Sequence, residues 1–151
     1  MMQVKFGIYL IGYVVMPEHV HVLLLPQARG CMEPLPISRL LNAFKQHVGY
    51  YGKAWLRDYW REHGSLWSEP LNRWARGEFG DQPLWNTRGH DFNIDRQQTL
   101  IEKLDYCHKN PVTRELVDHP EEWAWSSYRF YEMDDASILR LDWDGGWPIV
   151  W

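Results

Sequence analysis

The sequence is poor in cysteine and has no hydrophobic run long enough to cross a membrane. Its 151 residues include two cysteines, Cys31 and Cys107, which form neither a C-x-x-C pair nor a zinc-ligand spacing. That usage is typical of a reducing compartment, and we expect neither thiol to be functional. The apolar run from Phe6 to Met16 is shorter than the roughly 20 residues that a membrane helix needs, and no signal-peptide cleavage site follows it. We therefore expect a cytoplasmic protein with no membrane partner.

Several catalytic signatures and a general excess of positive charge are also missing. The stretch "GYYGK" is too short for a P-loop and lacks the following Ser or Thr, and no G-x-S-x-G occurs. The net charge of −4 argues against a general polyanion binder. It is uneven, however: residues 37–90 hold eight basic and five acidic side chains, net +3, whereas residues 91–151 hold six and thirteen, net −7. The middle third is the part that could face phosphate.

The aromatic content is high and the length suits one domain. Ten Trp, eight Tyr and five Phe predict aromatic surfaces as well as a core. The β-branched runs at 4–15 and 19–25, separated by Pro17, predict an antiparallel hairpin. Helical periodicity predicts helices over 37–60 and 95–109, the second ending near Asn110-Pro111. We expect a loop over 63–83, room for a short strand in 83–94, and an acidic, Trp-rich tail over 119–151.

Two histidines lie one residue apart in "MPEHVHVLLLP". Because side chains alternate along a strand, His19 and His21 share one face and could reach one metal ion. A pair of structural histidines in a hairpin is the alternative. No further ligands at zinc spacing are obvious, so a third ligand must come from elsewhere in the chain.

The second helix offers that ligand and a nucleophile. Tyr106 and Asn110 are four residues apart and share a helix face, roughly 200° from the apolar stripe centred on Leu104. Tyr106 could be a half-exposed interface aromatic or a nucleophile, and the Asn110 carbonyl oxygen suits a hard cation. Both interpretations of this pair stay open on the residues alone.

Three motifs, in order, carry a resemblance to a known family. "GYVVMPEHVHVLLLP", "PLWNTRGHDF" and "LDYCHKNPVTRELVDHPEEWAWSSY" resemble the REP-associated tyrosine transposases, the single-tyrosine branch of the HUH endonuclease superfamily, over about residues 8–128. The resemblance implies a ferredoxin-like (βαββαβ) α+β domain over 1–128, followed by a C-terminal tail over 129–151. In that family's pattern Tyr106 is the nucleophile, while His19, His21 and Asn110 bind Mg²⁺ or Mn²⁺. Asp91 and Trp85 match recurrent positions to which we assign no role.

The resemblance implies metal-dependent nicking and strand transfer on single-stranded DNA through a 5′-phosphotyrosine, at hairpin-forming palindromic repeats, in a nucleoid-associated monomer. The basic middle third would bind the backbone phosphates, and DNA bases could stack on Trp55, Trp60, Trp67 or Trp74. The cations concerned are Arg39, Lys45, Lys53, Arg57 and Arg61. For any one of them, a solvated helix face is the competing interpretation.

Two departures from the family pattern matter. Glu18 stands where the family usually has Asn, and its carboxylate could contact the metal or face solvent. The family's first strand and first helix precede the point where this chain begins, so we expect a truncated domain that is poorly stable or self-associating. A non-catalytic DNA-binding remnant is therefore the alternative function, and a metal-binding protein unrelated to nucleic acids is a third.

Overall fold

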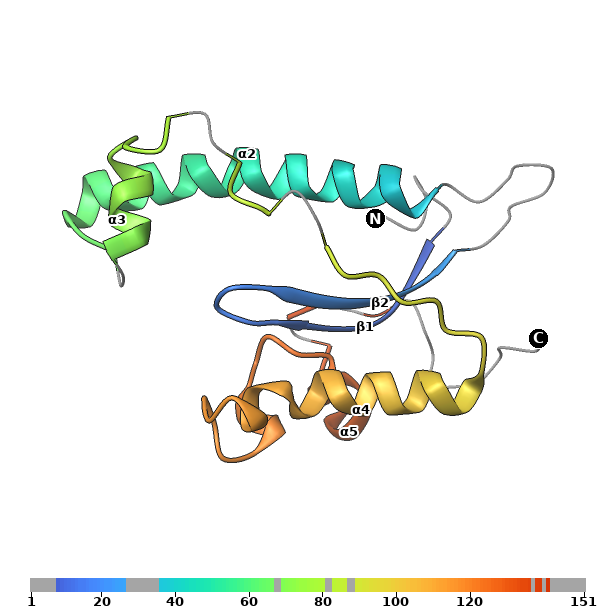
Figure 1. Cartoon of the computed structure of the whole chain (residues 1–151). Helices are drawn as coiled ribbons and strands as arrows, with labels where there is room; N and C mark the ends of the chain where they lie inside the picture. Colours follow the sequence, from blue (N-terminus) through green and yellow to red (C-terminus); the bar gives the residue numbers. More distant parts are fainter. Residues whose placement is uncertain are drawn as a thin grey trace. The chain divides into compact units, whose positions relative to one another are not determined.

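The computed structural model describes residues 8–26, 36–66, 69–80, 83–86, 89–136, 138, 139 and 141. Within them the chain is a mixed α+β protein with one two-stranded antiparallel sheet (Figure 1). Its elements are β1 (Ile8–Val15), β2 (Val20–Pro26), α2 (Ile37–His63), α3 (Glu69–Ala75), α4 (Gln97–Thr113), the 3₁₀ turn η1 (Pro120–Glu122) and α5 (Tyr128–Met133). By packing, the chain divides into unit 1, Met1–Leu35 with Phe92–Trp151, and unit 2, Pro36–Asp91.

The predicted hairpin is confirmed in unit 1. β1 pairs antiparallel with β2, with a register shift between Leu10 and Gly12. The connection is tight, because the backbone N–H of Met16 donates to the carbonyl of His19 at 2.8 Å. Residues 4–7 of the predicted first strand lie outside the described residues.

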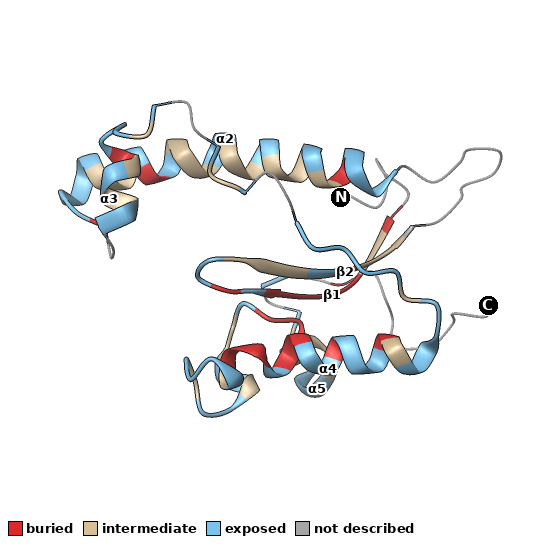
Figure 2. Cartoon of the chain, viewed as in Figure 1, coloured by how far each residue is buried: buried red, intermediate tan, exposed pale blue. Residues whose placement is uncertain are grey.

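The core of unit 1 lies between the hairpin and α4. Figure 2 shows buried positions along β1 and along one side of α4. The fully packed members of this cluster are Ile11, Val14, Met16, Leu23, Leu100, Leu104 and Cys107. Gly12 permits the close approach, since a Cβ there would lie 2.5 Å from Leu104 Cδ1. Cys107 is a core residue, and burial raises the pKa of its thiol to about 12; Cys31 lies outside the described residues.

The predicted end of the second helix is wrong by one turn. α4 runs through Pro111 to Thr113, although proline removes a helical hydrogen bond and disfavours helix before it. The Pro111 ring is fully buried, and its carbonyl accepts the N–H of Leu116 at 3.0 Å. Packing and this closing bond therefore outweigh the local preference.

The acidic tail begins with ordered structure that the sequence did not predict. A segment before α5 borders β1: the Val15 N–H donates to the Trp125 carbonyl at 2.8 Å, and the Ser127 N–H donates to the Tyr13 carbonyl at 2.9 Å. η1 and α5 also lie in this part of the chain, and residues 142–151 are outside the described set. The short strand for which residues 83–94 had room does not form in the described part of that range. Among the described residues the sheet therefore has only the strands β1 and β2.

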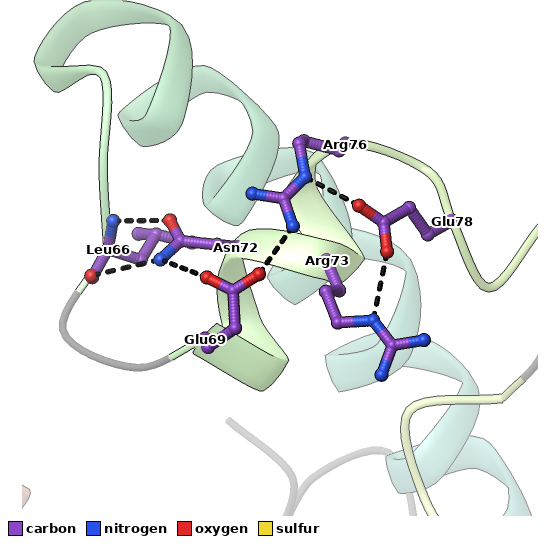
Figure 3. A network of polar contacts seen from close by, with 6 residues as sticks. All are labelled: Leu66, Glu69, Asn72, Arg73, Arg76 and Glu78. Atoms are coloured by element: carbon purple, nitrogen blue, oxygen red, sulfur yellow. Dashed lines mark hydrogen bonds and ion pairs between the residues drawn. The ribbon is translucent and has the colours of Figure 1, made fainter.

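Unit 2 is built on α2, which confirms the predicted helix. Gly64, the residue after its end, adopts the left-handed conformation (φ 73°) and caps the helix. The prediction of a loop over 63–83 is wrong, because α3 forms within it. A side-chain network holds this short helix (Figure 3): Asn72 Oδ1 accepts from the Leu66 N–H at 2.7 Å, and Arg76 pairs with both Glu69 and Glu78 at 2.6 Å. Polar contacts of this kind leave no apolar period in the sequence.

The expected absence of a membrane helix and the expected domain boundary concern the whole chain. None of the helices in the described ranges has the length and apolarity to cross a bilayer. The expected boundary after residue 128 stays a prediction, since the packing units follow a different division of the chain.

Candidate functional site

The two histidines of the hairpin converge on one point. His19 is the last residue of the turn before β2, and His21 lies within β2. Their Nε2 atoms are 3.0 Å apart, which is hydrogen-bond distance. Their rings meet edge to face, with centroids 4.8 Å apart. Burial, and then the neighbouring His19, lower the pKa of His21, which favours the neutral imidazole.

α4 brings the predicted tyrosine and amide to the same place. The Tyr106 ring contacts the His21 ring edge to face at 5.5 Å, and Asn110 Nδ2 lies 3.3 Å from His21 Nε2. Tyr106 is 55% exposed, as expected for a side chain off the apolar stripe. Asn110 shares its helix face but is buried, because it faces the hairpin one turn farther on.

These residues fit a small divalent ion. Two ligands at right angles around an octahedral ion, each about 2.1 Å away, lie about 3.0 Å from each other, which matches the two histidine Nε2 atoms. Asn110 Oδ1 is buried and has no hydrogen-bond partner among the described residues. A half-turn of the amide would bring this acceptor toward His21. No group of three His, Cys, Asp or Glu side chains that could hold a metal ion forms in the described chain. The two histidines and Asn110 would therefore be the ligands that the described residues supply, and other positions around the ion would be left for water and phosphate.

The Glu18 carboxylate forms ion pairs with two side chains, and neither pair involves the Nε2 atoms that would bind the ion. Its Oε1 pairs at 2.5 Å with Arg114, the residue that follows the last residue of α4, and lies 3.4 Å from His19 Nδ1. The pairing joins the hairpin turn to the end of the tyrosine-bearing helix. A carboxylate beside Nδ1 also favours the tautomer whose Nε2 lone pair is available to an ion.

A buried network beside the site escaped the sequence analysis. His108 Nε2 lies 2.9 Å from Ser127 Oγ, which donates to the Tyr13 carbonyl at 3.1 Å and accepts from the Tyr13 N–H at 3.0 Å. With its hydrogen and one lone pair used, the Ser127 hydroxyl accepts the third bond from the Nε2–H tautomer of His108. Burial lowers the pKa of His108 to about 4. Both residues lie in quoted motifs, but spacing alone did not reveal that they meet.

The predicted DNA-binding cations lie in unit 2, and three of the five gather. Lys45, Lys53 and Arg57 line one groove along α2. Arg39 and Arg61 do not line it, and Arg61 pairs with Asp58 at 2.8 Å. These positions come from one helix, so their grouping follows from helical spacing.

The aromatics proposed for stacking are divided among different environments. Trp55 is 52% exposed, whereas Trp60 packs against the Leu56 cluster and Trp74 lies 4.7 Å beneath Lys53 Nζ. Trp67 is outside the described residues. Trp85, from a motif of unassigned role, lines the same groove, and Asp91 is exposed.

Comparison of the chain with protein-family models, with curated proteins and with solved structures found no match.

Proposed function

We propose that this protein nicks single-stranded DNA and transfers the strand through a covalent bond to Tyr106, with Mg²⁺ or Mn²⁺ as cofactor. One observation carries the proposal: two imidazoles and an amide converge beside an exposed tyrosine, with the His19 and His21 Nε2 atoms 3.0 Å apart. The four residues lie in two of the motifs whose order along the chain resembles the HUH family. A ferredoxin-like sheet in the complete domain, hairpin-forming repeats as substrate and association with the nucleoid belong to the same proposal.

The residues would divide the reaction between them. His19, His21 and Asn110 would hold the ion, which supplies Lewis acidity and orientation at the scissile phosphate. Tyr106 Oη attacks phosphorus, forming a 5′-phosphotyrosine while the bond from phosphorus to the 3′-oxygen breaks. The phenol proton is lost and the released 3′-oxygen gains a proton, so the step is balanced. The phosphodiester energy is kept in the new bond, so attack by a DNA 3′-hydroxyl can rejoin a strand without ATP.

A non-catalytic DNA-binding remnant is the second candidate. The two-stranded sheet of the described residues favours it, because β2 pairs there on only one side, with β1. The remnant would bind single-stranded DNA and form no adduct.

Adduct formation separates the two candidates. Wild-type protein with a hairpin oligonucleotide and Mn²⁺ should give a protein–DNA band that survives denaturation, and Tyr106→Phe should give none while it keeps its fold and DNA affinity. Tyr128→Phe is the matched control, because Tyr128 belongs to the same motif region but contacts the buried His108 ring at 5.5 Å. An adduct that persists in Tyr106→Phe and disappears in Tyr128→Phe would overturn the assignment. No adduct in any form would favour the remnant.

A further inference from the structure

A groove of about 520 Å³ runs along α2 in unit 2. This volume is within the range of about 300–1,000 Å³ that is usual for ligand sites. Seven of the residues come from α2 and the other five from the chain after α3. Among them are Lys45, Gly49, Tyr50, Lys53, Arg57 and Trp85.

The second wall of the groove is held against the helix by direct contacts. Gly49 and Gly52 present no side chain, and Cβ atoms built there would lie 3.9 Å from Trp85 Cδ1 and 3.6 Å from Leu84 Cδ2. Lys45 Nζ donates to the Asn86 carbonyl at 2.9 Å. The groove is therefore a packed feature of unit 2.

The described lining carries positive charge and no carboxylate. Lys45 and Arg57 are twelve residues apart, about 18 Å along the helix axis, with Lys53 between them. One strand of nucleic acid carries a phosphate every 3.4 Å or so of duplex axis, so this length spans several successive phosphates. A row of cations suits an extended polyanion better than a single small anion.

The groove also offers an aromatic surface. Tyr50 lines the groove and is 73% exposed, so its ring is accessible to a stacking partner.

We propose that this groove binds single-stranded nucleic acid, with phosphates along Lys45, Lys53 and Arg57 and a base stacked on Tyr50. Basic grooves with stacking aromatics are the usual way that proteins hold unpaired strands without reading their sequence. The inference rests on the proposed function for the choice of DNA as the strand. It needs neither the metal nor Tyr106.

Fluorescence anisotropy with a labelled oligothymidylate, in chelator, tests the groove. Lys45→Ala and Arg57→Ala should each reduce the magnitude of the salt slope by about 0.7, the value per phosphate contact on a single strand. Tyr50→Ala should weaken binding at least about fivefold, the low end for loss of a stacked base. Lys45→Arg keeps the positive charge and should therefore keep the salt slope. Comparison with Lys45→Ala then shows whether the charge of Lys45, rather than its bond to the Asn86 carbonyl, is responsible for the effect.

Two matched controls lie on the same helix outside the groove: Arg39→Ala and Arg61→Ala. Both should bind as wild type does, with unchanged helix content by circular dichroism. Equal losses in groove and control variants, equal affinity for a duplex competitor, or no binding at all would each overturn the proposal. The adduct assay is read separately: nicking without groove dependence refutes this inference alone, and groove binding without an adduct refutes the proposed nickase alone.

Discussion

At the scale of residues, one short motif serves two purposes on two sides of a helix. In "YCHKN" the first and last residues are four apart and share a face, whereas the central histidine lies on the other side. Tyr106 and Asn110 accordingly face the hairpin histidines, and His108 bonds Ser127 in the core. The resemblance supplied roles only for Tyr106 and Asn110. The contact of His108 could not be predicted, because Ser127 is distant in sequence and no spacing rule links it to His108.

The metal prediction is tested by calorimetric titration with Mn²⁺. His19→Ala and His21→Ala should each weaken binding by at least about tenfold, because even outer-shell losses at metal sites cost 10–100-fold. Asn110→Ala should weaken it less, since water can replace an amide oxygen. His90→Ala, an exposed histidine of unit 2, is the control and should bind as wild type does. Unchanged affinity in both hairpin-histidine variants would rule out the site.

At the scale of elements, regular apolar patterns were predicted well and polar or packed exceptions were not. The hairpin and α2 follow from alternation and from a helical period. α3 was missed because ion pairs and the Asn72 contacts with Leu66 hold it. α4 continues past the expected stop because the Pro111 ring is buried, which a local rule for proline cannot include.

The glycines of these elements should respond in opposite ways to alanine. At Gly49 and Gly52 in α2 a Cβ meets only ordinary contacts, at 3.9 and 3.6 Å, so each substitution should raise the free energy of unfolding by about 0.5–1 kcal/mol. Gly12→Ala should lower it by about 1–3 kcal/mol, because the new Cβ would lie 2.5 Å from Leu104 Cδ1 in the core. Urea unfolding of the three variants measures both effects. Stabilisation by Gly12→Ala would show that the contact between β1 and α4 is looser than described.

At the scale of the whole molecule, the division into two units was not visible in the sequence. The expected single domain over 1–128 follows the order of the motifs, whereas unit 1 joins two segments separated by the fifty-six residues of Pro36–Asp91. Packing across such a separation leaves no local pattern. The proposed chemistry lies entirely in unit 1 and the proposed strand groove entirely in unit 2, so each can be tested by variants that leave the other unchanged.

Stability should fall in mild acid because of His108. Its folded-state pKa is about 4, below the unfolded value of about 6.5, so between these values the unfolded chain binds more protons than the folded one. The stability contributed by neutral His108 is therefore complete above about pH 6.5 and is lost as the pH falls toward 4. Between about pH 7 and pH 5 the expected loss is of the order of 2 kcal/mol, before most carboxyl groups titrate.

Urea unfolding in chelator at the two pH values measures this loss, with His108→Gln as the comparison. Glutamine can still donate to Ser127 Oγ but does not titrate. The variant should start less stable at neutral pH and lose less on acidification. Some loss remains, because the pKa of the partly buried His21 is also lowered and that histidine still contributes. An equal loss in wild type and variant would mean that the imidazole bonded to Ser127 is accessible to protons in the folded chain. The core between β1 and α4 would then be open to solvent at that point.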